Sequence, residues 1–498
     1  MHSVIFVIFG IFDIFSKYPR SVRLHLRIFL HKCPAGKGKL PQVKNAPIHD
    51  RLSDAALPSQ PTSAQERIFS IDVLRGFALL GILVANIDDF ATPEAMFDIP
   101  LGLPLPAFSG PHSHLNLMIL TFKWMFIEGK MRSLFAMLFG AGVVLMAERG
   151  SRRGTQEQTA DIFLRRNMWL CLLGVLHACL VWHHDILFCY GLTALLFLYP
   201  CRKLKPKTLI LSGSLISLVF ATFGMFGLLG ATSDFSLSKD SARIEAIERK
   251  GGVLSPDQQD IQKAWKARVD SQTVTPQSID AAMADANQPY LASVLERVQF
   301  LYTGAPAATV ELFLVIDALG TMLIGIGLFK NGFLTGEKPN ATYVWTAIVG
   351  FGIAEPLYLI GVWKSYQSGF YFLTIEKWLF LPYYLTREAG ALAILSVLLL
   401  IIKGQVMYRI QALVAAVGKT ALSNYIFTSL LCQFLFVWGP WDLYGKLEYY
   451  QIHYVVIAVW AVNLTISQVW QRRFLFGPIE WLWRSLTYAR PQPFQRSE

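Results

Sequence analysis

Ten long apolar segments, separated by polar stretches, constrain the fold of this chain more than any other feature. About 20 apolar residues are enough to cross the hydrocarbon core of a bilayer as a helix. Inside a bilayer the backbone has to satisfy its own hydrogen bonds, which such a helix does. The sequence therefore predicts an all-α, polytopic transmembrane helix bundle of about ten spans. The expected spans are 70–89, 131–148, 162–182, 184–200, 208–230, 309–329, 341–362, 379–402, 418–438 and 452–471.

The charge of the chain allows two kinds of partner, and its distribution favours one of them. Only 16% of residues are charged and 53% are hydrophobic, whereas soluble proteins carry about 25% charged residues. A net charge of +11 would also suit a nucleic-acid-binding protein. The basic residues, however, form short clusters between the apolar segments, where membrane proteins place them. We therefore expect a lipid bilayer as the partner and no nucleic acid.

The basic clusters also predict the orientation of the spans. Residues 90–122 and 182–185 contain no Lys or Arg, whereas 149–153, 202–207 and 472–473 are rich in them. Basic residues accumulate in cytoplasmic loops. The alternation predicts a protein of the inner cell membrane in which both ends of the transmembrane domain face the cytoplasm.

The chain divides into five parts by composition. Residues 1–64 form a basic, poorly ordered extension, 65–230 and 309–488 two halves of five spans each, 231–308 a hydrophilic insertion, and 489–498 a tail. The extension has two interpretations. One is an interfacial basic anchor, and the other is that translation begins further along the chain.

The insertion at 231–308 is expected outside the cytoplasm as a small helical cap. Ser255-Pro256 and Thr275-Pro276 are each typical of a helix start, with a hydroxyl at the N-cap and proline at the first helical position. Elsewhere, the six cysteines form no Cys-x-x-Cys pair and no histidines have metal-ligand spacing. We therefore predict no metal site.

Several polar residues are expected together at the outer ends of the early spans. Lys130 and Arg132 open the second span on the side where basic residues are scarce. Charges in such a place are costly unless they are paired or used in function. The predicted cluster contains Asn86, Asp88, Lys130, Arg132, His177 and Asp185.

This cluster has a possible catalytic chemistry. An imidazole beside a carboxylate can act as a general base or acid near neutral pH. His177 is the candidate base, with Asp185 or Asp88 to orient it, and Lys130, Arg132, Asn86 and Trp182 are candidate substrate-binding residues. The alternative is a structural, hydrogen-bonded histidine among structural ion pairs.

Short motifs along the chain from about Glu66 resemble the YeiB-like family of bacterial membrane proteins, which carry the DUF418 domain. No single motif is specific, but the ordered set is. The motifs are Ile71-Asp72-Val73-Leu74-Arg75-Gly76, Gly129-Lys130-Met131-Arg132, Gly174-Val175-Leu176-His177-Ala178, Gly418-Lys419-Thr420-Ala421-Leu422-Ser423-Asn424-Tyr425 and Gly477-Pro478-Ile479-Glu480-Trp481-Leu482-Trp483-Arg484.

The resemblance implies a fold related to membrane acyltransferases, including heparan glucosaminide acetyltransferase, which use a histidine in the membrane domain. It implies transfer of an acyl group from acyl-CoA to an envelope sugar, lipid or similar acceptor. Arg75, Arg165 and Arg166 would then bind the phosphates of coenzyme A, and no cofactor would be permanently bound. The alternative function is a transporter or channel for a small solute or lipid, with Glu311 and Asp317 along its path.

Overall fold

The computed structural model describes residues 68–93, 110–152, 156–223, 228–303 and 305–496. The predicted extension at 1–64 lies outside these ranges. Within them every regular element is helical, which confirms the all-α prediction. Eight of the described helices are long and apolar enough to cross a membrane: Phe69–Ala91, Ser113–Glu148, Gln158–Leu180, Glu311–Lys330, Asn340–Gln367, Tyr383–Lys403, Ala421–Trp438 and Tyr449–Arg473.

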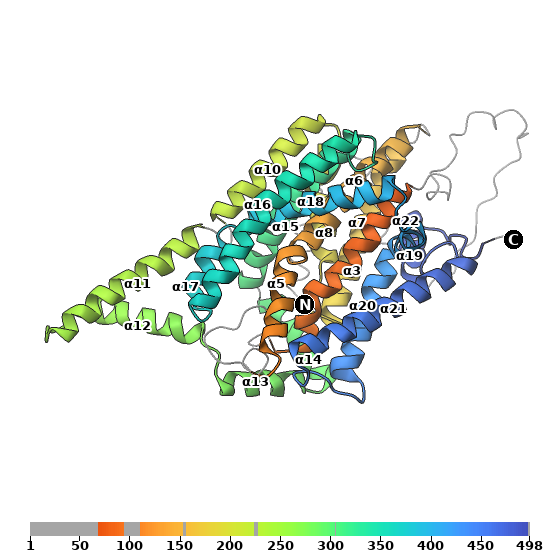
Figure 1. Ribbon diagram of the computed structural model, residues 1–498. Coiled ribbons are helices and arrows are strands. Elements are labelled where there is room, and N and C mark those ends of the chain that lie inside the picture. Colours follow the sequence, from red (N-terminus) through yellow and green to blue (C-terminus); the bar gives the residue numbers. More distant parts are fainter. Residues whose placement is uncertain (1–67, 94–109, 153–155, 224–227, 304, 497–498) are drawn as a thin grey trace, which may run out of the picture.

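Eight of the ten predicted spans fall on these helices, and the other two, 184–200 and 208–230, overlap shorter apolar helices. The shorter apolar segments are Leu187–Cys201 and Pro206–Phe220. The first of them is divided into α8 (Leu187–Thr193), a π-helical turn (Ala194–Leu198) and α9 (Tyr199–Cys201). Figure 1 shows the helices packed as one bundle. The other bundle helices are α3 (Phe69–Ala91), α5 (Ser113–Phe126), α6 (Lys130–Arg152), α7 (Gln156–Leu180), α10 (Pro206–Phe223), α15 (Ala305–Lys330), α16 (Asn340–Gln367), α18 (Tyr383–Lys403), α19 (Tyr408–Lys419), α20 (Ala421–Gln433) with η5 (Phe434–Trp438), and α21 (Tyr449–Arg473).

Glycines allow two pairs of helices in the centre of the bundle to cross closely. A Cβ atom on Gly140 of α6 would collide with the backbone of Met322, and one on Gly325 of α15 with the backbone of Met137. In the same way Gly418 of α19 lies against the Asp72 carbonyl of α3. Small residues at such crossings are the usual means of packing helices within a membrane. These crossings hold α6 against α15 and α3 against α19, beside the polar residues described below.

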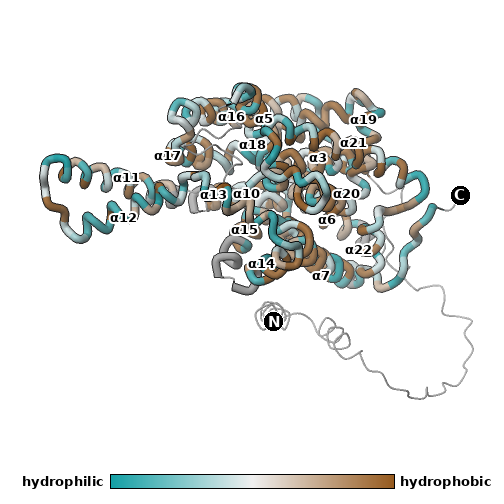
Figure 2. Tube along the Cα trace, turned by 90° about the horizontal axis from the view of Figure 1, so that it is seen from below, coloured by the Kyte–Doolittle hydropathy of each residue, from teal (hydrophilic) through white to brown (hydrophobic). Residues whose placement is uncertain are grey.

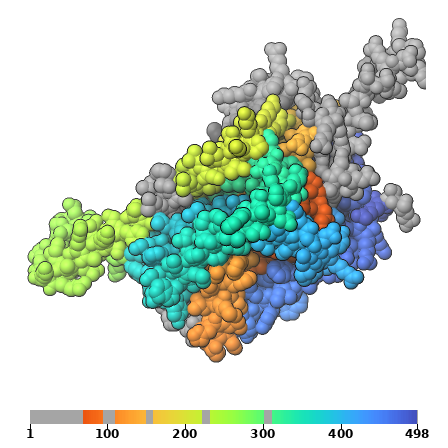
Figure 3. Space-filling view, turned by 45° about the horizontal axis from the view of Figure 1, so that its top comes forward, coloured from red at the N-terminus to blue at the C-terminus, as the bar shows by residue number. Residues whose placement is uncertain are grey.

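The hydrophilic insertion forms four helices, α11 (Leu228–Arg249), α12 (Pro256–Ser271), α13 (Pro276–Ala286) and α14 (Tyr290–Thr303). Ser255 and Thr275 cap α12 and α13 with complete capping boxes, as their sequences predict. The α11–α12 hairpin projects from the bundle (Figure 1), and hydrophilic residues run along it (Figure 2). Figure 3 shows it extending beyond α10 and α16, which cover one face of the bundle.

An ion pair holds the base of this hairpin against the bundle. The guanidinium of Arg268 donates to Asp234 at 2.6 Å and to Glu376 at 3.2 Å. Glu376 begins η4 (Glu376–Phe380), which continues the short α17 (Phe372–Ile375). The hairpin is therefore attached through its base, and its far end reaches away from the bundle.

Two shorter helices complete the part of the bundle that is relevant to function. One face of α5, which precedes α6, buries Asn116, Lys123 and Trp124 inside the protein. The C-terminal motif forms α22 (Pro478–Tyr488), which packs against α7 and α20.

Candidate functional site

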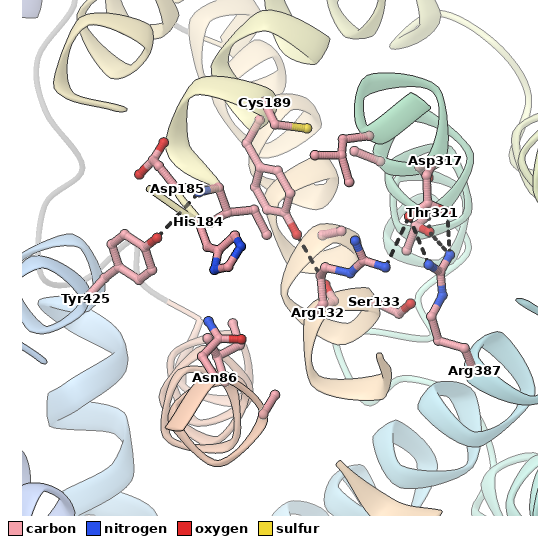
Figure 4. A pocket seen from close by; sticks show the side chains of 17 residues that line it. Asn86, Arg132, Ser133, His184, Asp185, Cys189, Asp317, Thr321, Arg387 and Tyr425 are labelled. Carbon is pink, nitrogen blue, oxygen red and sulfur yellow. Dashed lines mark hydrogen bonds and ion pairs between the residues drawn. The ribbon is translucent and has the colours of Figure 1, made fainter. Parts of the chain in front are cut away.

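A polar cavity of about 240 Å³ lies among α3, α6, α8, α15, α18 and α20. Figure 4 shows its polar side chains in two groups, with Tyr425, His184 and Asp185 on one side and Arg132, Asp317 and Arg387 on the other. We call it the polar cavity. Its remaining polar lining residues are Asn86, Ser133, Tyr190 and Thr321.

A second cavity, of about 150 Å³, lies toward the beginning of α3. Four basic side chains line it together with one carboxylate, and we call it the basic cavity. The two cavities share Ile82, Ile186, Tyr190 and Tyr425 as lining residues, so they lie on either side of one wall. The charged lining residues of the basic cavity are Arg75, Arg166, Lys419, Arg484 and Glu480.

The two cavities together follow a large part of α3. Arg75 lines the basic cavity and Asn86 the polar cavity. Eleven residues of helix correspond to about 16 Å at a rise of 1.5 Å per residue. The pair of cavities therefore extends over about half of the hydrocarbon thickness of a bilayer, which is about 30 Å.

His177 and Asp185 meet as predicted, but the carboxylate is the one that lines the cavity. His177 Nδ1 lies 2.9 Å from Asp185 Oδ1. The other oxygen, Oδ2, accepts a hydrogen bond of 2.8 Å from the backbone N–H of Phe188, in the first turn of α8. Both side chains are buried, with 1% exposed for His177 and 2% for Asp185, and Asp185 is the one of the two that lines the polar cavity. A proton taken up from the cavity would therefore reach Asp185 before His177.

A second imidazole–carboxylate pair lies at the same cavity and was missed from the sequence. His184 lines the polar cavity, and its Nδ1 lies 3.1 Å from Asp89 Oδ2. His184 was not among the predicted site residues. The spacing on α3 could have indicated that Asp89 belongs to the site. Asp89 follows the predicted residue Asn86 by three positions, so the two share a helix face.

Arg132 joins a buried network of charges on the other side of the polar cavity. Arg387 binds both oxygens of Asp317, at 2.6 and 2.8 Å, and Arg132 lies 3.5 Å from the same carboxylate. Arg387 also donates to Glu388 at 2.7 Å. Thr321 and Ser133 donate to the same oxygen of Glu388, at 2.8 and 3.1 Å. Arg387 and Glu388 were missed, although two adjacent charges inside a predicted span are themselves a signal.

Asp88 and Lys130 do not line either cavity. Asp88 is buried and accepts hydrogen bonds from Lys123 Nζ at 2.5 Å and from the hydroxyl of Tyr449 at 3.3 Å. Lys130 is fully buried, donates to the carbonyl oxygen of Trp124 at 3.0 Å and lies 3.9 Å above the ring of Tyr358. Of the predicted outer cluster, Asn86, Arg132 and Asp185 share the polar cavity, with His177 behind Asp185.

Trp182 and Arg165 also lie apart from the cavities. The ring of Trp182 is buried and stacks on Phe90 at 4.2 Å. Arg165 is exposed on α7. Of the three arginines predicted to bind phosphates, Arg75 and Arg166 are therefore the two that line the basic cavity.

The C-terminal motif builds one side of the basic cavity. Trp483 Nε1 donates to the Arg166 carbonyl oxygen at 2.8 Å, and the Arg166 guanidinium stacks 4.4 Å from the Trp483 ring. Glu480 accepts hydrogen bonds from the backbone N–H groups of Leu422 and Ser423, at 2.7 and 3.1 Å, at the start of α20. Burial raises the pKa of Glu480, and these hydrogen bonds oppose that shift. Glu480 therefore caps α20, while the basic side chains face the cavity beside it.

Comparison with known proteins identifies the kind of protein that this bundle represents. The fold is that of a multi-pass membrane protein with polar residues inside the bundle. The family described as "Protein of unknown function (DUF418)" matches residues 328–490. The chain belongs to this family of YeiB-like membrane proteins, as its motifs predict.

The relatives extend the match over nearly the whole chain. "Uncharacterized protein YxaH" of Bacillus subtilis is 30% identical over 444 residues, which cover 88% of this chain and 98% of that protein. "Uncharacterized protein YeiB" of Escherichia coli is 28% identical over 430 residues, covering 86% and 98%. An "Uncharacterized 39.9 kDa protein in amylase 3'region" of Bacillus acidopullulyticus is 25% identical, covering 87% and 97%. No solved structure matches the chain.

Proposed function

We propose that this protein is a transmembrane acyltransferase that moves an acyl group from acyl-CoA to a sugar, lipid or similar acceptor of the cell envelope. The observation that carries the proposal is the common wall of the basic and polar cavities. A donor with a phosphate-rich head and a long thin arm needs both kinds of environment. The pair of cavities offers a cationic end and, within the same bundle, a carboxylate with a histidine behind it.

The basic cavity suits the head of the donor. Guanidinium groups bind phosphate through paired, charge-assisted hydrogen bonds. Arg75, Arg166 and Arg484 come from three different helices and line one space. The basic loops of the chain favour the cytoplasmic side for this end, which is the compartment that supplies acyl-CoA. The arm of the donor would pass between Tyr190 and Tyr425 to bring its thioester into the polar cavity.

Asp185 and His177 would handle the proton of the reaction. The hydroxyl or amine of the acceptor attacks the thioester carbonyl, so a C–O or C–N bond forms and the C–S bond breaks. The proton of the acceptor moves to Asp185 and is shared with His177, 2.9 Å away. The coenzyme A thiolate leaves and takes up that proton. Proton transfer by positioned groups of this kind contributes about 10²–10⁴-fold to rate.

The test is acyl transfer by the purified full-length protein, with radiolabelled acyl-CoA and an envelope fraction as the source of acceptor. We expect labelled product from the wild type, and a loss of about 10²-fold or more in Asp185→Asn and His177→Ala with acyl-CoA binding retained. Asp260→Asn is the matched control, because Asp260 is 75% exposed on the insertion. Lack of acyl-CoA binding and turnover in the wild type would refute the proposal.

The buried charge network favours a second candidate function, proton-coupled transport of a small solute. Asp317 and Arg387 pair inside the bundle and both line the polar cavity. Ionisable residues in such positions often form part of ion or proton paths. Uptake into proteoliposomes that depends on a proton gradient would favour transport over acyl transfer.

A further inference from the structure

Arg132 is the cation that the polar cavity exposes most. Its side chain is 34% exposed, compared with 7% for Asp317 and 1% for Arg387. All three line the cavity, and Figure 4 shows Arg132 between the Asp317–Arg387 pair and the opposite wall. A ligand in this cavity would therefore meet the Arg132 guanidinium before either of the other two charges.

The carboxylate beside Arg132, that of Asp317, is already neutralised by Arg387. Arg387 holds Asp317 through two hydrogen bonds of 2.6 and 2.8 Å, the length of strong charge-assisted bonds. Arg132 is 3.5 Å from the same carboxylate, beyond that length. Among the described residues, Asp317 is the one carboxylate within 4.0 Å of Arg132. Asp317 therefore orients Arg132 and leaves hydrogen-bond donors of the guanidinium directed at the cavity.

The opposite wall has the complementary chemistry. Asn86 presents an amide there that can donate and accept, and His184 presents an imidazole. Both groups can exchange hydrogen bonds with a hydroxyl or an amine of a ligand. The volume of about 240 Å³ is below the ~300–1,000 Å³ of sites for drug-sized ligands. The cavity therefore accommodates a group about as large as a single sugar ring.

We propose that the polar cavity binds a small polar substrate whose carboxylate or phosphate pairs with Arg132 and whose hydroxyl or amine lies at Asn86 and His184. A sugar acid or a sugar phosphate has this chemistry. The inference rests on the proposed function only in treating this cavity as the substrate site. It applies equally to an acyl acceptor and to a transported solute.

The test is equilibrium binding to the purified full-length protein in detergent, in the absence of acyl-CoA. Radiolabelled glucuronate, glucose 6-phosphate and glucose are matched probes, because they share a ring and differ in the anionic group. We expect binding of at least one anionic probe and at least tenfold weaker binding of glucose. Glucuronate and glucose 6-phosphate distinguish a carboxylate from a phosphate as the recognised group.

Variants of Arg132 test whether the anionic probe binds at this residue. Arg132→Gln should weaken binding of the anionic probe by about 10- to 100-fold, the size expected for loss of a charge-assisted hydrogen bond. Arg132→Lys should retain part of the affinity, which shows that the site is folded. Arg243→Gln is the control, since Arg243 is 80% exposed on the insertion.

Three outcomes would overturn the inference: glucose binding as tightly as the anions, anion binding unchanged in Arg132→Gln, or no binding of either anion to the wild type. Because acyl-CoA is omitted, these outcomes are independent of the acyltransferase test. Anion binding without acyl transfer would leave this inference standing and refute the proposed function.

Discussion

The basic and polar cavities adjoin in one bundle but balance their charges differently. Four basic side chains and one carboxylate line the basic cavity, and that carboxylate, Glu480, caps α20. In the polar cavity Arg387 is matched by Asp317 through two hydrogen bonds. The comparison separates two uses of buried charge: an excess of one sign favours an anionic ligand, whereas a matched pair fixes the geometry of its surroundings. The predictions below test that difference.

The largest expected effect is on stability, from breaking the matched pair of the polar cavity. Removing one partner of a buried ion pair leaves an uncompensated charge and costs about 3–5 kcal/mol. Asp317→Asn should therefore lower the free energy of unfolding by about that amount, because Arg387 is 1% exposed. Thermal or denaturant unfolding of the purified protein measures it.

A double variant shows whether the pair is the cause. Asp317→Asn combined with Arg387→Gln should be less destabilised than the sum of the two single variants, since neither charge is then left alone. Additive losses would mean that the two residues act separately, and the contrast between the cavities would fail.

The next effect concerns donor binding and should be confined to the basic cavity. Arg166→Gln should raise the KM for acyl-CoA about tenfold with kcat nearly unchanged, because one guanidinium–phosphate contact is lost. Lys207→Gln is the control, as Lys207 is an exposed basic residue at the start of α10. A fall in kcat at constant KM would instead assign Arg166 to the chemical step.

The smallest effect comes from the cap that supports the basic cavity. Glu480→Gln replaces the carboxylate with a neutral amide, which keeps one accepting oxygen but loses the negative charge, and so weakens the capping of α20. The loss should be about 1 kcal/mol, as for other N-cap substitutions, and is measurable as a lower unfolding midpoint. Glu245→Gln, at an exposed position on α11, is the comparison. Equal stability of the two variants would show that the cap contributes nothing.

Most of the fold could be predicted from the sequence, but only part of the site could. Long apolar segments predict spans because a bilayer leaves the backbone little choice, and Ser255 and Thr275 predict helix starts through local hydrogen bonds. The prediction was weakest at α8, where a π-helical turn interrupts the segment Leu187–Cys201. Such a turn depends on packing rather than on local propensity.

Only part of the site could be predicted from the sequence. A buried charged side chain indicates that it needs a partner, but it does not indicate which residue that partner is. Lys130 was expected beside carboxylates at the cavity, yet its amine lies over the ring of Tyr358. Asp88 was expected at the same cavity, and its partner is Lys123 on α5. Which faces of α3, α5 and α6 meet depends on the packing of the whole bundle. The contact between His177 and Asp185 was easier to predict, because the two residues are eight positions apart in the sequence, across one tight turn.

The most direct test of the central claim, that the two cavities form one donor path, is a structure of the protein with a non-hydrolysable acyl-CoA analogue. The account predicts phosphates at Arg75 and Arg166, the arm between Tyr190 and Tyr425, and the carbonyl within the polar cavity near Asp185. An analogue bound on the surface of the bundle, with the wall between the cavities intact and both cavities empty, would contradict it.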